Sequence, residues 1–274
     1  MAGRRNRAPA EVPGHLAHPD WSDLLTHALN VEGSLGDTYR RFRQYSTRNC
    51  AFLLMQGCPV EPVATFAGWK AVDRHVTKGA SAFYIQRPIL VKTGEVDQET
   101  GEDKKIQRFM PVKSVFPVSM TEGEPLPEIE LPEWSRSRAL AALAIHEVAF
   151  QTQVANTQGY SAGREIAINP AAKYPAKTFF HELGHIELGH TDSDAHANYL
   201  RHRGPMELGA EAVAHLVTNE LGLLTPEMAS VSRAYIQTWS AGERPTDGDV
   251  RAIFKAADSI IEAGRVPKEQ AWAS

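Results

Sequence analysis

Residues 178–190 read TFFHELGHIELGH and contain the pattern His-Glu-x-x-His, which begins at His181 and ends at His185. On an α-helix, residues four apart lie on the same face, so both imidazoles can reach one metal ion. Zinc accepts neutral imidazole nitrogens in tetrahedral coordination. Glu182 follows the first histidine directly, where its carboxylate can take a proton from a water molecule at the metal. The stretch therefore predicts a zinc-dependent peptidase site with Glu182 as the general base.

The residues around the motif favour a buried helix over residues 175–188. Four apolar side chains, Phe179, Phe180, Leu183 and Ile186, give it a surface to bury. Gly184 lies inside the motif, where glycine is unfavourable by about 1 kcal/mol relative to alanine. We therefore expect another element to pack closely against that turn, and we expect Gly189 to end the helix.

A third protein ligand is needed, because a catalytic zinc site leaves one position for water. His190 is one residue short of the spacing at which some peptidases place a third histidine, and that position holds Thr191. Glu207 and Glu211 lie four residues apart in an expected helix over residues 205–221. We favour Glu207 as the ligand and Glu211 as the group that holds a ligand histidine by its second nitrogen, with the reverse assignment left open.

Composition indicates an ordinary globular protein of 274 residues with a net charge of −4. Cys50 and Cys58 do not make a disulfide framework, which fits a reducing compartment. No stretch is long and apolar enough for a membrane span, and the arginine-bearing N-terminus has no apolar region typical of a secretory signal. We expect a cytoplasmic protein with no membrane partner.

The pattern along the chain predicts an α+β fold: a small N-terminal α+β module, then a mostly helical domain with a short sheet. The boundaries are a disordered tail over 1–18, the first module over 19–120, a Pro- and Glu-rich linker over 121–133, and the second domain over 134–274. Expected helices cover residues 47–56, 66–72, 134–155, 175–188, 205–221, 226–241 and 246–263, with a further helix from Trp21. Expected strands cover residues 82–92, 107–118 and 165–169.

In the second half, His181–His185 followed by a helix with Glu207 and Glu211 resembles the zincin-like peptidases related to ImmA/IrrE. In that family the first acid of the later helix is the metal ligand, which implies Glu207. The strand 165–169 (EIAIN) is similar to the edge strand on which such peptidases align substrate. Gly209 departs from that pattern, because the family often has an acid there.

The first half resembles the single-stranded-DNA-binding domain of ArdC-type antirestriction proteins. The similar stretches are residues 45–56, 63–69 (VATFAGW), 76–79 (VTKG), Ile85 with Pro88, and 112–123. The resemblance implies a DNA-binding domain joined to a metallopeptidase domain, in proteins that protect incoming DNA from restriction. Ala80 and Ser81 depart from the family, which often has an acid and a glycine there.

Single-stranded DNA is the partner that this resemblance implies, together with a protein or peptide substrate. Basic residues near aromatic ones can neutralise phosphates and stack on bases. The alternative is a solvated basic helix face. The candidate DNA contacts are Arg40, Arg41, Arg43, Arg48, Trp69, Lys70 and Lys78.

Two other functions remain open from the sequence. The chain could protect DNA sterically as a non-catalytic single-stranded-DNA-binding protein, with a structural metal site. It could instead act as an ImmA/IrrE-like peptidase on a transcriptional repressor.

Overall fold

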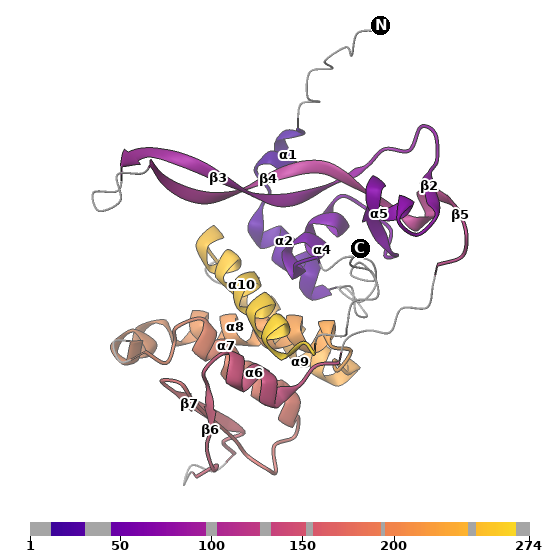
Figure 1. Ribbon diagram of the computed structural model, residues 1–274. Helices are drawn as coiled ribbons and strands as arrows, with labels where there is room; N and C mark the ends of the chain where they lie inside the picture. Colours follow the sequence, from indigo (N-terminus) through magenta and orange to yellow (C-terminus); the bar gives the residue numbers. More distant parts are fainter. Residues whose placement is uncertain are drawn as a thin grey trace, which may run out of the picture.

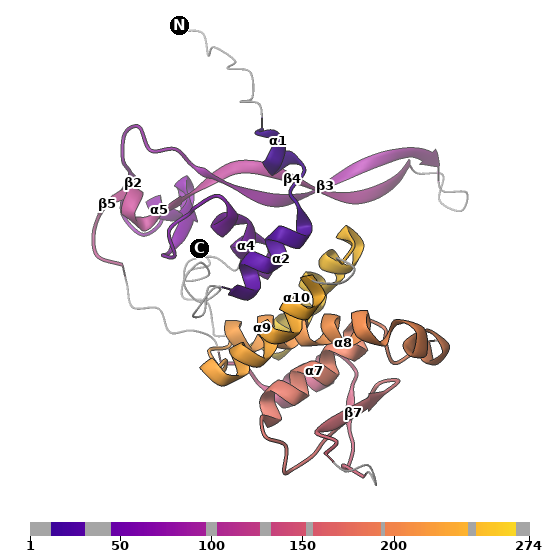
Figure 2. The same cartoon turned by 180° about the vertical axis from the view of Figure 1, so that it is seen from behind.

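The computed structural model describes residues 12–30, 45–96, 103–126, 133–151, 156–192, 195–240 and 245–266. The predicted α+β fold is confirmed. A long two-stranded ribbon, β3–β4, lies at one end above helices α2 and α4, and a small sheet lies at the other end (Figures 1 and 2). Helices α7, α8, α9 and α10 fill the space between them, so the sequence motif lies in the middle of the molecule.

The N-terminal helices begin at the residues that can cap them. Helix α2 (Trp21–Asn30) starts after Asp20, whose carboxylate accepts from the backbone N–H of Asp23, and α4 (Thr47–Met55) is capped by Ser46. A short helix, α1 (Gly14–Ala17), precedes them and buries Leu16. The prediction of a disordered tail over 1–18 is therefore wrong for residues 12–18, and residues 1–11 lie outside the described residues.

The ribbon consists of β3 (Phe83–Val96) and β4 (Asp103–Pro117), which pair antiparallel and extend beyond both expected strands. Strand β1 (Val63–Thr65) pairs with the other side of β4, and helix α5 (Phe66–Lys70) follows it. A second small pair joins β2 (Arg74–Val76) to β5 (Thr121–Gly123), after the 3-10 turn η1 (Val118–Met120). The expected linker therefore begins with a paired strand.

The second half departs from the expectations at three places. Helix α6 covers only Arg136–Ala142, because the chain turns at Ala144 (φ 51°) into strand β6 (His146–Glu147), so the helix over 134–155 was wrong. Helix α8 begins at Ala195 and ends at Glu220, with Pro205 inside it instead of at its start. Strand β8 (Glu165–Ile168) is central in the order β6-β8-β7, so it is not the expected edge strand, and β7 (Gly159–Ala162) and β6 are the two edges.

The remaining helices follow the prediction within a few residues. They are α7 (Pro175–Glu187), α9 (Pro226–Ser240) and α10 (Asp247–Gly264), the last with a capping box between Thr246 and Asp249. None of the helices in the described ranges has the length and apolar character that crossing a membrane requires.

One buried core includes side chains from both halves of the chain. Leu24 and Leu29 of α2 and Phe52 of α4 belong to the same cluster as Phe179 of α7 and Phe254 of α10. The backbone N–H at the start of α4 also donates to Asp258 of α10 (2.7 Å). The expected halves therefore pack together, and their boundary as independent domains stays a prediction.

Candidate metal centre

Helix α7 carries the motif and ends where the sequence predicts. Pro175 occupies its first turn, where the absent N–H is not needed. At the other end, Gly189 takes a left-handed conformation (φ 74°), and the N–H of His190 donates to the carbonyl of His185 (2.9 Å). This glycine-based ending turns the chain back, so His190 lies beside the last turn of the helix.

Close packing at Gly184 brings α8 against the histidine face of α7. A Cβ at Gly184 would lie 3.1 Å from the Cα and the carbonyl oxygen of Ala210, and 3.2 Å from Cβ of Val213. The expectation that glycine permits a close neighbour at this turn is confirmed. Glu207 lies about one turn before Ala210 on α8, so the close approach carries its carboxylate to the histidines.

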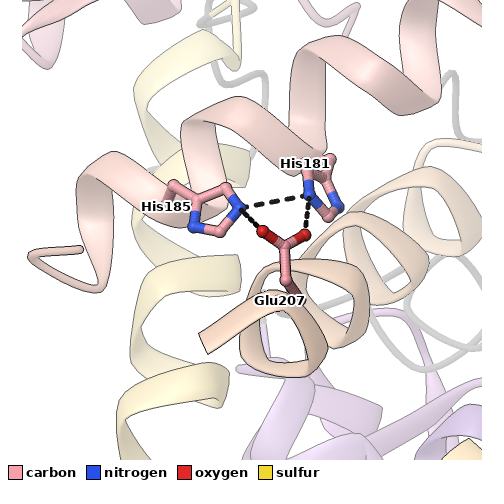
Figure 3. A group of neighbouring side chains, drawn as sticks. All are labelled: His181, His185 and Glu207. Carbon is pink, nitrogen blue, oxygen red and sulfur yellow. Dashed lines mark hydrogen bonds and ion pairs between the residues drawn. The ribbon is translucent and has the colours of Figure 1, made fainter. Parts of the chain in front are cut away.

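His181, His185 and Glu207 converge on one point (Figure 3). The two Nε2 atoms are 3.2 Å apart, and carboxylate oxygens of Glu207 lie 3.4 Å from Nε2 of His181 and 3.8 Å from Nε2 of His185. Ligands about 2.0–2.1 Å from a tetrahedral zinc ion lie roughly 3.3–3.4 Å from one another. The three residues therefore fit a metal ion of this size.

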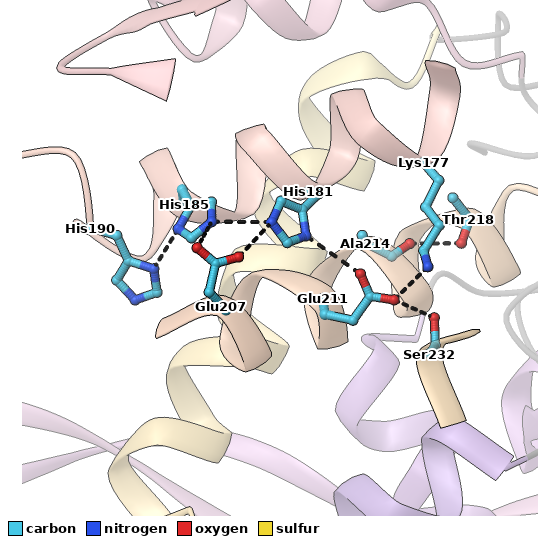
Figure 4. A network of polar contacts seen from close by, with 9 residues as sticks. All are labelled: Lys177, His181, His185, His190, Glu207, Glu211, Ala214, Thr218 and Ser232. Carbon is cyan, nitrogen blue, oxygen red and sulfur yellow. Dashed lines mark hydrogen bonds and ion pairs between the residues drawn. The ribbon is translucent and has the colours of Figure 1, made fainter. Parts of the chain in front are cut away.

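Glu211 lies on the other side of His181, away from the centre of this triangle (Figure 4). Its Oε2 is 3.4 Å from Nδ1 of His181, and its Oε1 is 2.5 Å from Nζ of Lys177 and accepts from the hydroxyl of Ser232 (2.7 Å). Of the two acids, Glu207 is thus the one near both Nε2 atoms, in agreement with the favoured assignment.

Protonation at His181 competes with metal binding. Burial alone lowers the pKa of His181, but bonds to Glu207 and Glu211 and the nearby Glu182 raise it to about 9. Burial also raises the pKa of Glu211, but His181 and Lys177 outweigh it and lower the pKa to about 2. A cation between the three ligands would replace that proton, since ligand histidines must be neutral.

His190 contacts His185 but is not one of the three residues that converge on one point. Its Nδ1 lies 3.0 Å from Nδ1 of His185, on the side away from Glu207. Burial and the neighbouring His185 lower the pKa of His190 to about 4, which keeps the ring neutral at physiological pH. The position of His190 in the sequence therefore makes it a neighbour of His185, and not a third histidine at the point where His181, His185 and Glu207 converge.

Glu182 faces a cleft of about 420 Å³ that also contains the three converging residues. The side chain is buried (8% exposed), and the hydroxyl of Ser161 donates to its Oε2 (2.7 Å). Edge strand β7, residues 159–162, forms one wall of the cleft, and residues 190–192 form another. A buried carboxylate, the three converging side chains and strand β7 thus line one cavity.

Two of the expected DNA contacts pack against other parts of the chain. Trp69 is 0% exposed and its indole N–H donates to the carbonyl of Phe116 (2.9 Å), so it offers no ring face to a base, and its inclusion is corrected. Arg48 is half-buried, with its guanidinium 3.5 Å from the ring centroid of Phe109, and is a packing residue between α4 and the ribbon. Lys70 and Lys78 are exposed. Arg40, Arg41 and Arg43 lie outside the described residues.

Sequence reasoning missed the side chains that contact Glu182 and Glu211. Ser161 and Ser232 come from segments with no spacing signal relative to these two carboxylates. Lys177 alone had a hint, because it lies four residues before His181 on the same helix face.

No protein family and no curated protein matches this sequence at a significant level. Two solved structures are similar in fold, both of the antirestriction ArdC protein from the R388 plasmid. The metal-free structure is 16% identical over 90% of this chain and 95% of that chain, with a TM-score of 0.49. The Mn(II)-bound structure is 15% identical over 89% and 97%, with a TM-score of 0.43. Both are structures of an ArdC protein, the family that the sequence resembles.

Proposed function

We propose that this chain is a zinc-dependent peptidase. The observation that carries the proposal is the convergence of His181, His185 and Glu207 beside Glu182 in one cleft. Two imidazoles and one carboxylate are the ligand set of many hydrolytic zinc sites, with a fourth position left open for water. The donor set also favours zinc over magnesium or calcium, which prefer oxygen ligands.

A bound zinc ion would lower the pKa of water and polarise a carbonyl oxygen. Glu182 supplies what the metal does not, a carboxylate that accepts a proton from water and returns it to the leaving amine as the peptide C–N bond breaks. Ser161 orients that carboxylate by its 2.7 Å bond. The edge strand β7 supports binding of an extended peptide, because its outer backbone groups are not used by the sheet.

The test is hydrolysis of an unfolded protein by the zinc-loaded chain, with Glu182→Gln as the matched variant. Glutamine keeps the size of the side chain but cannot accept the proton, so we expect at least about a 100-fold loss of activity with unchanged zinc content. Equal activity of the two proteins would show that the cleavage comes from a contaminant or from another base.

A second activity, nucleic-acid binding, is supported by the β3–β4 ribbon, which extends past helices α2 and α4 in both views (Figures 1 and 2). Residues 87–92 and 104–113 contain six basic and no acidic residues, and the basic side chains are exposed. Exposed apolar side chains lie among them, including Leu90 (71% exposed) and Met110 (48%). Cations that neutralise phosphates beside apolar surface for bases are typical of single-strand binding.

We propose that the two activities act together, as the ArdC resemblance implies. A peptidase held at single-stranded DNA would protect the DNA of mobile elements. Glu182→Gln and the dependence of cleavage on DNA separate this context from the two alternatives. Full protection by that variant would favour steric protection by DNA binding alone. Cleavage of one repressor without any need for DNA would favour the ImmA/IrrE-like alternative.

A further inference from the structure

Lys177 occupies a position that is unfavourable for a lysine by itself. It lies in the first turn of α7, where the helix dipole disfavours a cation, and its side chain is only 8% exposed. Burial of an ion pair costs desolvation energy that the pair often does not recover. A buried charge at this position is therefore weak evidence of a purely stabilising role.

The partners of Glu211 are divided between its two oxygens. Nζ of Lys177 (2.5 Å) and the hydroxyl of Ser232 (2.7 Å) both contact Oε1. The other oxygen, Oε2, faces Nδ1 of His181 at 3.4 Å. Figure 4 shows the order along the two helices: Lys177, then Glu211, then His181, then Glu207.

We propose that Lys177 is a positioning residue for the metal centre. Lys177 on α7 and Ser232 on α9 both bind Oε1 of Glu211. Lys177 thereby fixes the rotation of the Glu211 carboxylate, so that Oε2 accepts from Nδ1 of His181. That bond sets the tautomer of His181 and directs Nε2 towards Glu207 and His185. Because Lys177 and His181 are one turn apart on the same helix, the orientation of the ligand is locked to the helix that carries it. The inference rests on the proposed metal centre.

The experiment measures the zinc dissociation constant of the full chain by competition with a chelating dye. Lys177→Met and Glu211→Gln should each weaken zinc binding by about tenfold, the range typical for partners of ligand histidines. The double variant should bind no more weakly than Glu211→Gln, because Lys177 acts through Glu211. Lys173→Met is the matched control: it removes the same charge from an exposed position just before α7, and its affinity should equal that of the wild type.

The cobalt-loaded proteins add a readout that a purely structural role would not change. The visible absorption of bound cobalt should shift in Lys177→Met, as in Glu211→Gln, and stay unchanged in Lys173→Met. If Lys177→Met does not fold, Ser232→Ala removes the neutral partner of Oε1, leaves both charges, and should weaken zinc binding several-fold by the same rotation of Glu211.

Wild-type affinity in Lys177→Met, or in Ser232→Ala where that variant replaces it, would overturn the inference. So would a double variant about 100-fold weaker than wild type, since the two losses would then be independent. A wild-type chain that binds no zinc would remove the proposed metal centre itself, and the two failures are thus distinguishable.

Discussion

Gly184→Ala tests whether close approach of α7 and α8 builds the metal centre. The added Cβ would lie 3.1 Å from the backbone of Ala210, against 3.4–4 Å for an ordinary contact, so α8 must move by a few tenths of an ångström. Overpacking costs about 1–3 kcal/mol and the gain in helix propensity returns about 1 kcal/mol, so the free energy of unfolding should fall by about 0–2 kcal/mol. Metal ligands tolerate shifts of only about 0.2 Å, so zinc affinity should fall by about tenfold or more.

The assay combines urea denaturation of the metal-free protein with zinc titration against a chelating dye. Gly209→Ala is the matched control on α8, because its Cβ would meet only the flexible tip of Leu188 at 3.1 Å and the ring of His190 at 3.7 Å. It should keep zinc affinity, and its free energy of unfolding should equal that of the wild type or exceed it by up to about 1 kcal/mol, because the same gain in helix propensity applies. If Gly184→Ala is instead more stable than wild type and binds zinc equally well, the packing argument for Glu207 is wrong.

Three further predictions follow from single contacts. Ser161→Ala should reduce peptide hydrolysis about fivefold at unchanged zinc affinity, because one hydrogen bond to Glu182 contributes about 1 kcal/mol; a rate equal to wild type in a turnover assay would contradict this. Replacing Lys105 and Arg108 together by glutamine should reduce the slope of log affinity against log salt for single-stranded DNA by about 1.4, whereas the same change at exposed Lys255 should not. Trp69→Ala should lower the free energy of unfolding by about 3–5 kcal/mol in urea denaturation, as expected for a fully buried ring. A variant as stable as the wild type but with weakened DNA binding would instead support Trp69 as a DNA contact.

The part of the site carried by one helix could be predicted from the sequence. His181, Glu182 and His185 depend only on the helical repeat, and Gly184 pointed to close packing that the structure confirms. Glu207 was favoured over Glu211 from the two acids on the later helix, the resemblance gave a second reason, and the distances to both Nε2 atoms agree. Ser161 could not be found, because its bond to Glu182 depends on how β7 lies against α7.

The errors in the fold arose where local pattern and tertiary structure disagree. Residues 143–151 are apolar enough to continue a helix, but the left-handed turn at Ala144 directs the chain into β6, which pairs with β8 over a long sequence separation. Pro205 looks like a helix start, yet α8 runs through it. Trp69 was read as a DNA contact by its motif, and only the packing against β4 shows that it is buried.

The most direct test of the central claim is the zinc content of the dialysed, zinc-reconstituted wild type beside His185→Ala and Glu207→Ala. We predict about one zinc per wild-type chain and almost none in either variant, with the helical circular dichroism of all three proteins alike. A wild type without zinc, or a Glu207→Ala protein that retains a full equivalent, would contradict a metal centre built from α7 and α8.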